Sequence, residues 1–219
     1  PIVVLFAMYH DILDAWWMAD DSMDLLSVAR HGILPHFYRP LIELDLTPSN
    51  LTPWPYASYG IDFLLGGLNP RLAYVHHLIS WSITLGVLAI ALRKWLGPAV
   101  TALVLVWFIL AVPTSTAVFF LCTRHYVEGL LFATLCVLAY GKYLRSGRPI
   151  YLASSAGCYA LAMTAKEIFV PLGPLLIFHH VLFVETASLQ QGQPRVLSAL
   201  GNACRSLWPY VALAARRRG

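Results

Sequence analysis

Long apolar runs alternate with short charged clusters along this chain, and this alternation limits its possible folds more than any other feature. The run Leu72–Leu92 contains no Asp, Glu, Lys or Arg. A helix needs about 20 consecutive apolar residues to cross the hydrocarbon core of a bilayer. Only 12% of all residues are charged, whereas a soluble domain carries about 25%. The sequence therefore predicts an all-α fold, a polytopic bundle of transmembrane helices.

Proline, glycine and basic residues divide the apolar sequence into segments. Pro70 and Pro98 stand where a helix is expected to begin, because proline fits the first turn. The span after Pro98 is expected to end at Pro113 or to continue, kinked, towards Leu121. We expect the end of a partial first helix at 1–9, an outer loop at 10–71, spans at about 72–92, 98–121, 126–144, 150–165 and 168–184, and a polar cytoplasmic segment with the start of a truncated helix at 186–219.

The outer loop is acidic and contains two predicted surface helices. Seven acidic and two basic residues between His10 and Tyr56 give this segment a net charge of −5. Apolar residues recur every three or four positions after Asp21, which predicts an amphipathic helix at the membrane interface that ends at Gly32. A second surface helix is expected over Tyr56–Leu65.

The distribution of Lys and Arg predicts the orientation of the chain. With the expected spans, three basic clusters fall on one side of the membrane, which the positive-inside rule makes cytoplasmic: Arg93 and Lys94; Lys142, Arg145 and Arg148; Arg195 and Arg205. The acidic loop then lies on the opposite side. We expect an integral multi-pass protein of a bacterial plasma (inner) membrane with this loop in the periplasm. The basic residues form no stripe, so the lipid bilayer is an expected partner and nucleic acid is not.

Six charged residues on the acidic side are candidates for a functional site, and each has a structural alternative. Adjacent carboxylates at a helix start can divide their roles, one capping the helix and the other facing a cavity; alternatively, they are a cap and a solvated neighbour. A cation near them binds phosphate, forms a salt bridge or extends to the interface. An ionisable pair that interrupts an apolar run is often functional. The candidates are Asp20, Asp21, Arg39, Arg124, Lys166 and Glu167.

The order of several short motifs resembles the GT-C superfamily of membrane glycosyltransferases, in particular its protein O-mannosyltransferase-like and transmembrane tetratricopeptide-repeat branches. The resemblance covers Ile12–Pro174. Its motifs are Asp20-Asp21, Tyr38-Arg39-Pro40-Leu41, Gly67-Leu68-Asn69-Pro70, Tyr74-Val75-His76-His77-Leu78, the turn Pro113-Thr114-Ser115-Thr116-Ala117-Val118 that leads to Arg124, and Lys166-Glu167 before Pro171.

The resemblance implies transfer of a sugar from a polyprenyl-phosphate carrier on the outer face of the membrane. Asp20 and Asp21 would supply the general base and its partner. Arg39, Arg124, Lys166 and Glu167 would contact the donor or its phosphate. The resemblance leaves open whether a divalent metal ion binds at Asp20 and Asp21.

Two departures from the family pattern keep a second function in view. Ala117 stands where the family often has Glu, and family members continue through many more helices. The chain is therefore expected to be the N-terminal part of such an enzyme, or a degenerate, non-catalytic transmembrane subunit of a larger membrane complex. A transporter is less favoured, because the sequence lacks paired broken helices in inverted halves.

Overall fold

The computed structural model describes residues 1–39, 52–180 and 208. These residues fold into helices and connecting turns, and none of them belongs to a β-strand. The prediction of an all-α fold is confirmed for this part of the chain. Two segments are long and apolar enough to cross a membrane, Pro70–Leu110 and Leu121–Ser146. Further membrane spans stay a prediction.

Short connections join most of the helices. In chain order they are α1 (Ile2–Tyr9), the 3-10 helix η1 (His10–Asp14), α2 (Asp21–His31), α3 (Pro35–Tyr38), α5 (Trp54–Gly66), α6 (Pro70–Leu110), α7 (Val112–Phe119), the 3-10 helix η2 (Leu121–Thr123), α8 (Arg124–Ser146), α9 (Pro149–Ala165) and the 3-10 helix η3 (Glu167–Phe169). Residues 172–180 are helical as well.

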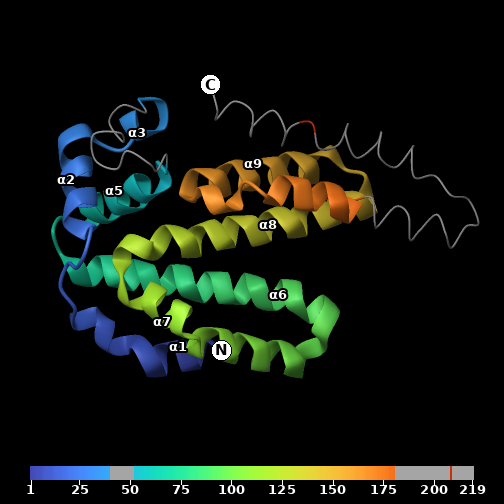
Figure 1. The fold of residues 1–219 in the computed structure, drawn as a ribbon, viewed down its shortest axis with the longest axis horizontal. Helices are drawn as coiled ribbons and strands as arrows, with labels where there is room; N and C mark the ends of the chain where they lie inside the picture. The colour runs from blue at the N-terminus through green and yellow to red at the C-terminus, as the bar shows by residue number, and fades with distance from the viewer. Residues whose placement is uncertain (40–51, 181–207, 209–219) are drawn as a thin grey trace, which may run out of the picture.

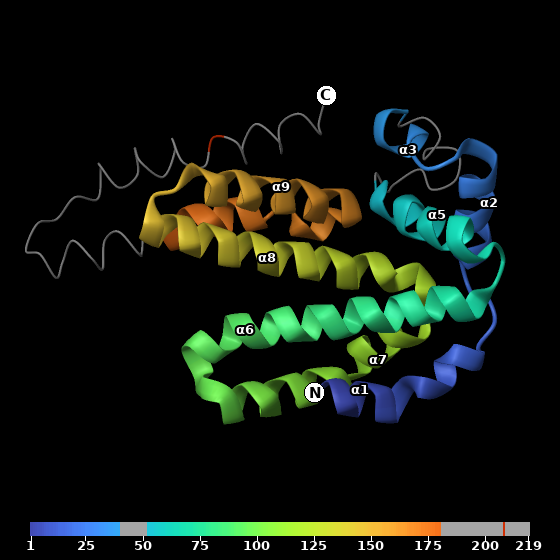
Figure 2. The ribbon, with the colours of Figure 1, turned by 180° about the vertical axis from the view of Figure 1, so that it is seen from behind.

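Helix α6 is a hairpin with two arms. Gly97 separates the arms with φ 73° and ψ 170°, and Pro98 begins the second arm. The Asn69 side chain caps the first arm by accepting a hydrogen bond from the backbone of Arg71 at 3.1 Å. At 1.5 Å per residue the first arm, 70–96, is about 40 Å long. Figures 1 and 2 show the second arm running back alongside the first.

The second arm ends close to Pro113, where the sequence predicts an end or a kink. Ala111 is extended with ψ 138°, and α7 begins at the next residue with Pro113 in its first turn. Proline lacks a backbone N–H, and inside a helix its ring collides with the carbonyl four residues earlier, here that of Ile109. The stretch that was expected to continue towards Leu121 is therefore a separate short helix.

Helices α8 and α9 form a second antiparallel hairpin. Gly147 closes α8 in the left-handed conformation with φ 65°, and Pro149 opens α9. Ser155 of α9 donates a hydrogen bond to the Cys136 carbonyl of α8 at 2.8 Å. Only 168–180 of the expected span 168–184 is described, and the expected segment 186–219 lies outside the described residues except for 208.

Opposite ends of the two hairpins carry opposite charge. Figures 1 and 2 place α2 and α5 at the end where α6 and α8 begin, and α2 packs against α5 and η2. The Gly97 turn and the end of α8 lie at the other end. Arg93 and Lys94 stand just before the first of these turns, and Arg145 stands in the last turn of α8. The fold thus separates the acidic helix α2 from these basic residues.

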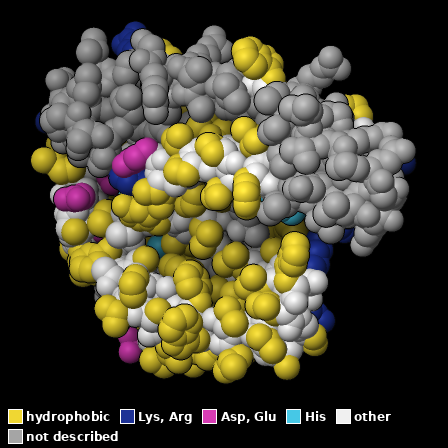
Figure 3. Space-filling view, turned by 45° about the vertical axis from the view of Figure 1, so that its right-hand side comes forward, with side chains coloured by type: hydrophobic (Ala, Val, Ile, Leu, Met, Phe, Trp, Pro, Cys, Tyr) yellow, Lys and Arg dark blue, Asp and Glu magenta, His cyan; other side chains and the backbone are white. Residues whose placement is uncertain are grey.

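Apolar side chains cover much of the outer surface of the helices. Figure 3 shows hydrophobic side chains across the described part of one face, with few charged side chains between them. On the second arm of α6, Leu103 and Trp107 are 69% and 74% exposed. Contiguous exposed apolar surface of this kind is typical of a face that contacts lipid or another protein.

Candidate functional site

The first turn of α2 holds two neighbouring aspartates in different environments. Asp20 occupies the N-cap position and is exposed, whereas Asp21 is fully buried. One oxygen of Asp21 accepts a hydrogen bond from the backbone of Met18 at 2.8 Å, and the other accepts one from the Tyr59 hydroxyl at 2.5 Å. Ala19 precedes the pair with φ 50°, a left-handed conformation that is uncommon for residues with a side chain. The two carboxylates therefore differ in exposure and in hydrogen bonding.

Burial raises the pKa of Asp21, while hydrogen bonds from Tyr59 and from the backbone of Met18 and Cys122 act in the opposite direction. Asp24, one turn later, is half-buried. Burial raises the pKa of Asp24 to about 7, and repulsion by Asp21 and Asp20 adds to this effect. The shift arises because α2 turns this side chain towards the protein.

Arg124 lies at the start of α8 and points into the protein. It is 1% exposed, and its Nη1 donates to the Asp62 carboxylate of α5 at 2.6 Å. Its guanidinium also lies 4.9 Å from the centre of the Tyr59 ring. Tyr59 therefore links Arg124 to Asp21, because its ring packs against the guanidinium and its hydroxyl donates to the carboxylate. The alternative of a side chain extending to the membrane interface is wrong for Arg124.

Glu128 follows Arg124 by one turn and accepts hydrogen bonds from two helices, α5 and α6. It accepts from Trp54 Nε1 at 2.6 Å, from Ser58 Oγ at 3.0 Å and from Ser80 Oγ at 3.2 Å. Arg124 Nε lies 4.0 Å from the same carboxylate. Trp54 of α5 thus donates its indole N–H to a buried acid.

His76 lies between the two buried acids. Its Nδ1 is 2.7 Å from Asp62 Oδ1, and its Nε2 is 3.6 Å from Glu128 Oε1. We call Asp62, His76, Arg124 and Glu128 the buried quartet, in which the two acids and the arginine are buried and the His76 side chain is 30% exposed. With a neutral imidazole the quartet has a net charge of −1, and with an imidazolium its charges balance.

Asp62 and Glu128 are absent from the candidates that sequence reasoning selects. A signal for them exists, because each is an isolated carboxylate in an apolar helix and such residues are costly unless paired. Glu128 also stands four residues after Arg124, the spacing of an ion pair on one helix face. The signal does not identify Asp62 as the partner, because 62 residues separate it from Arg124.

Lys166 and Glu167 lie where α9 gives way to η3. Lys166 is 8% exposed, and its Nζ is 3.4 Å from Glu167 Oε1. The ammonium also lies 5.6 Å from the centre of the Tyr126 ring of α8. A lysine this deeply buried is uncommon. The expected ion pair is present, and the pair faces α8 near its start.

Arg39 stands apart from these groups. Its side chain is exposed, and its guanidinium lies 5.7 Å from the ring centre of its own neighbour Tyr38. The cation beside the Tyr59–Asp21 pair is Arg124 and not Arg39, although Arg39 is one of the cations that the sequence offers as a neighbour of the two aspartates. The described residues contain no group of three or more His, Cys, Asp or Glu side chains arranged to hold a metal ion.

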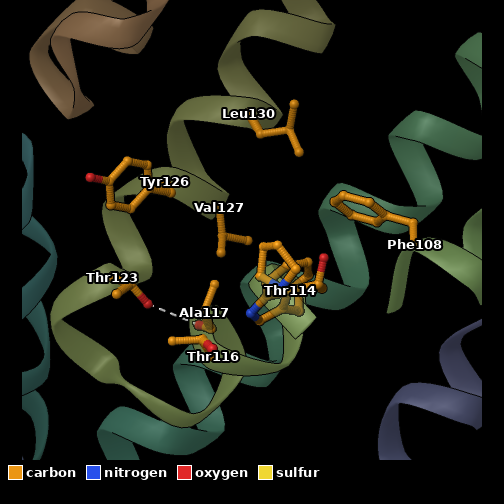
Figure 4. A pocket seen from close by; sticks show the side chains of 10 residues that line it. Phe108, Thr114, Thr116, Ala117, Thr123, Tyr126, Val127 and Leu130 are labelled. Atoms are coloured by element: carbon orange, nitrogen blue, oxygen red, sulfur yellow. Dashed lines mark hydrogen bonds between the residues drawn. The ribbon is translucent and has the colours of Figure 1, made fainter. Parts of the chain in front are cut away.

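Two cavities lie near this end of the molecule. A cavity of about 720 Å³ adjoins α2 and is lined by Trp16, Trp17, Ser22, Leu25, Leu26, Ala29, Phe63 and Leu68. A cavity of about 340 Å³ lies between α6, α7 and α8 and is lined by Trp81, Phe108, Pro113, Thr114, Thr116, Ala117, Thr123, Tyr126, Val127 and Leu130 (Figure 4). The first is lined by Trp17 and Ser22, which lie on either side of Asp20 and Asp21 in the chain, but by neither aspartate. Both have volumes in the range of small-ligand sites.

Comparison with protein-family models, with curated proteins and with solved structures finds no match to this chain.

Proposed function

We propose that this chain is a GT-C-like membrane glycosyltransferase, or the N-terminal part of one, that uses a polyprenyl-phosphate sugar at the α2 end of the bundle. One observation carries the proposal: Asp21 is buried and held by Tyr59 while Asp20, at the same turn, stays exposed. This division matches what glycosyl transfer requires, a fixed turn and a free carboxylate beside it.

In this proposal Asp20 is the catalytic base and Asp21 is a positioning residue. Asp20 removes the proton from the acceptor hydroxyl as that oxygen forms a bond to the anomeric carbon of the sugar. The bond from this carbon to the carrier oxygen breaks, and the phosphate leaves with the electron pair. Lys166, at the same end of the bundle, would stabilise the negative charge on the leaving phosphate.

The aromatic cavity beside α2 is the proposed site for the sugar or the first part of its carrier. Trp16 and Trp17 line it, and indole rings stack on sugar rings and also lie at membrane interfaces. The charge separation between α2 and the basic turns supports a multi-pass protein of a bacterial plasma membrane, with α2 on the outer, periplasmic side.

A transfer assay with polyprenyl-phosphate sugars tests the proposal. We expect Asp20→Asn to lower the rate about 100-fold or more, because a general base contributes about 10² to 10⁴. Asp14→Asn is the matched control, since Asp14 is an exposed acid of the same loop that belongs to η1. Equal rates for the wild type and Asp20→Asn would refute the catalytic assignment.

A second candidate function is that of a non-catalytic subunit in a membrane complex. The observation that favours it is Arg124, whose contacts are internal: it is buried against Asp62 and Tyr59. In that case the acids stabilise the fold, and Asp20→Asn leaves the yield of the complex unchanged. Arg124→Gln would then reduce that yield, measured by co-purification of partner subunits from the native membrane.

A further inference from the structure

The end of the bundle opposite α2 carries cations that the proposed transferase site does not use. It consists of the Gly97 turn and the turn between α8 and α9, which Figures 1 and 2 show at the same end. Five exposed cations stand at these two turns, and we call them the basic end: Arg93, Lys94, Lys142, Arg145 and Arg148. Between Asp62 and Glu167 the sequence has one acidic residue, Glu128, and it lies at the other end, near the start of α8.

The two turns lie at nearly the same height along the bundle. The first arm of α6 and helix α8 both run away from α2, and Thr84 of α6 donates a hydrogen bond to the Val127 carbonyl of α8 at 3.4 Å. Lys94 stands ten residues after Thr84, and Lys142 stands fifteen residues after Val127. At 1.5 Å per residue the two lysines therefore differ by about 8 Å along the helix axes. One layer of ligand can meet the cations of both turns.

The cations of the basic end have no carboxylate partner in the part of the chain that the structure describes. None of the salt bridges there involves any of the five. Lys142 lies over the ring of Tyr151, with its Nζ 4.4 Å from the ring centre. Like charges held at one end of a molecule repel each other, and a bound anion removes this repulsion. The basic end therefore favours an anionic partner.

Large apolar side chains border the same turns. Trp95 directly follows Lys94 and is 79% exposed, and Ile150, in the first turn of α9, is 63% exposed. A soluble anion gains nothing from these two side chains. A phospholipid presents a phosphate and the start of its acyl chains at one level, and tryptophan is enriched at this level of a membrane. The combination of cations with exposed apolar side chains thus favours a lipid.

We infer that the basic end binds the headgroups of anionic phospholipids, with phosphatidylglycerol as the test ligand, in the leaflet opposite to the side of α2. The phosphates accept charge-assisted hydrogen bonds from the guanidinium and ammonium groups. Trp95 and Ile150 contact the glycerol backbone and the first part of the acyl chains. The inference rests on the membrane position given in the proposed function and not on glycosyl transfer.

Native mass spectrometry of the full chain in detergent micelles tests this site. Phosphatidylglycerol and phosphatidylcholine with the same acyl chains are added in turn, and the bound fractions give the ratio of their dissociation constants. We expect phosphatidylglycerol to bind at least about fivefold more tightly, the effect of about one basic residue near an anionic lipid. Raising the ionic strength from about 0.05 M to about 0.5 M is expected to reduce this preference, because salt screens exposed charges.

Two double variants each remove the charge of one turn: Arg93→Gln with Lys94→Gln, and Arg145→Gln with Arg148→Gln. We expect each to lower the preference for phosphatidylglycerol at least threefold. Arg30→Gln with Arg71→Gln is the matched control, because these two arginines are exposed at the α2 end, and it is expected to keep the preference. Glycerol 3-phosphate, a phosphate without acyl chains, is expected not to displace the bound lipid.

Four results would overturn the inference: equal binding of the two lipids by the wild type, an unchanged preference in both basic-end variants, an equal loss in the control variant, or displacement by glycerol 3-phosphate. The last would identify a site for soluble phosphate. The measurement needs no sugar donor, and none of the substituted residues belongs to the proposed transferase site. The Asp20→Asn assay and the lipid measurement therefore fail separately.

Discussion

Asp24 connects the first turn of α2 to the pH dependence of stability. Burial raises its pKa from 3.8 to about 7, so its contribution to stability is complete below about pH 4 and is lost as the pH rises through 7. The change in the free energy of unfolding over this window is on the order of 4 kcal/mol. We expect Asp24→Asn to unfold at a higher temperature than the wild type at pH 8 and to show no such advantage at pH 4.

Thermal unfolding in detergent at pH 4 and pH 8 measures this effect. Asp14→Asn is the control, because Asp14 is an exposed acid of η1 that does not act on the pKa of Asp24. A residual slope is expected from Asp21, whose pKa is raised by burial in the same direction. If Asp24→Asn and the wild type differ equally at both pH values, the carboxyl of Asp24 is not the group responsible.

The buried quartet predicts strong coupling between Arg124 and Asp62. Removing one partner of a buried ion pair leaves a charge without compensation and costs about 3–5 kcal/mol. We expect Arg124→Met to lose stability in this range, and Asp62→Asn in the same molecule to restore part of it. Denaturant unfolding of the two single variants and the double variant gives the coupling energy.

Arg71→Met is the matched control for this cycle, since Arg71 is an exposed arginine near the start of α6. Additive losses for Arg124→Met and Asp62→Asn would show that the pair is uncoupled. The sequence identifies Arg124 as a residue of interest but not its inward direction. That direction depends on Asp62, which only the packing of α5 against α6 and α8 brings within reach.

Among the elements, the Gly97 turn offers a test of backbone strain without side-chain crowding. A Cβ at Gly97 would meet nothing within 4 Å, so the cost of Gly97→Ala comes from φ 73° alone. We expect a loss of about 1 kcal/mol in the free energy of unfolding. Gly86→Ala, also in open space but inside the first arm of α6, is expected to gain about 0.5–1 kcal/mol.

Denaturant unfolding measures the free energy of unfolding of both glycine variants, which we expect to fall in Gly97→Ala and to rise in Gly86→Ala. A gain at both positions would mean that Gly97 does not hold its positive-φ conformation. The sequence indicates this turn through Gly97-Pro98, and it indicates the start of α6 through Asn69-Pro70, because these residues act locally. At Pro113 the sequence leaves open whether the helix ends or continues kinked, and the extended conformation of Ala111 decides for an end.

For the whole molecule, the separation of charge follows from the sequence alone. Each apolar run that is long enough to cross the membrane moves the next connection to the opposite side. The sequence therefore predicts that the basic clusters share one end, even when the packing of the helices is unknown. The convergence of Asp21, Tyr59 and Arg124 does not follow in this way. These residues are supplied by α2, α5 and α8, and their meeting depends on how α5 lies across the ends of the hairpins.

The arrangement of the whole molecule predicts which residues share a side of the membrane. If both arms of α6 and then α8 cross it, Lys94 and Ser146 lie on one side and Ser22 lies on the other. Single cysteines at these positions, in a chain whose four native cysteines are replaced, can be labelled in intact cells with a membrane-impermeant maleimide. We expect labelling of Ser22→Cys only, and labelling of the other two after the cells are opened.

Ile83→Cys is the control for a position within the membrane, since Ile83 is exposed midway along the first arm of α6, a candidate span. We expect little labelling there before or after the cells are opened. Equal labelling of Ser22→Cys and Ser146→Cys in intact cells would place both ends of the hairpins in one compartment. The two α6 arms and α8 would then pack as a bundle that does not cross the membrane, and α2 would lose the outward position on which the proposed transfer depends.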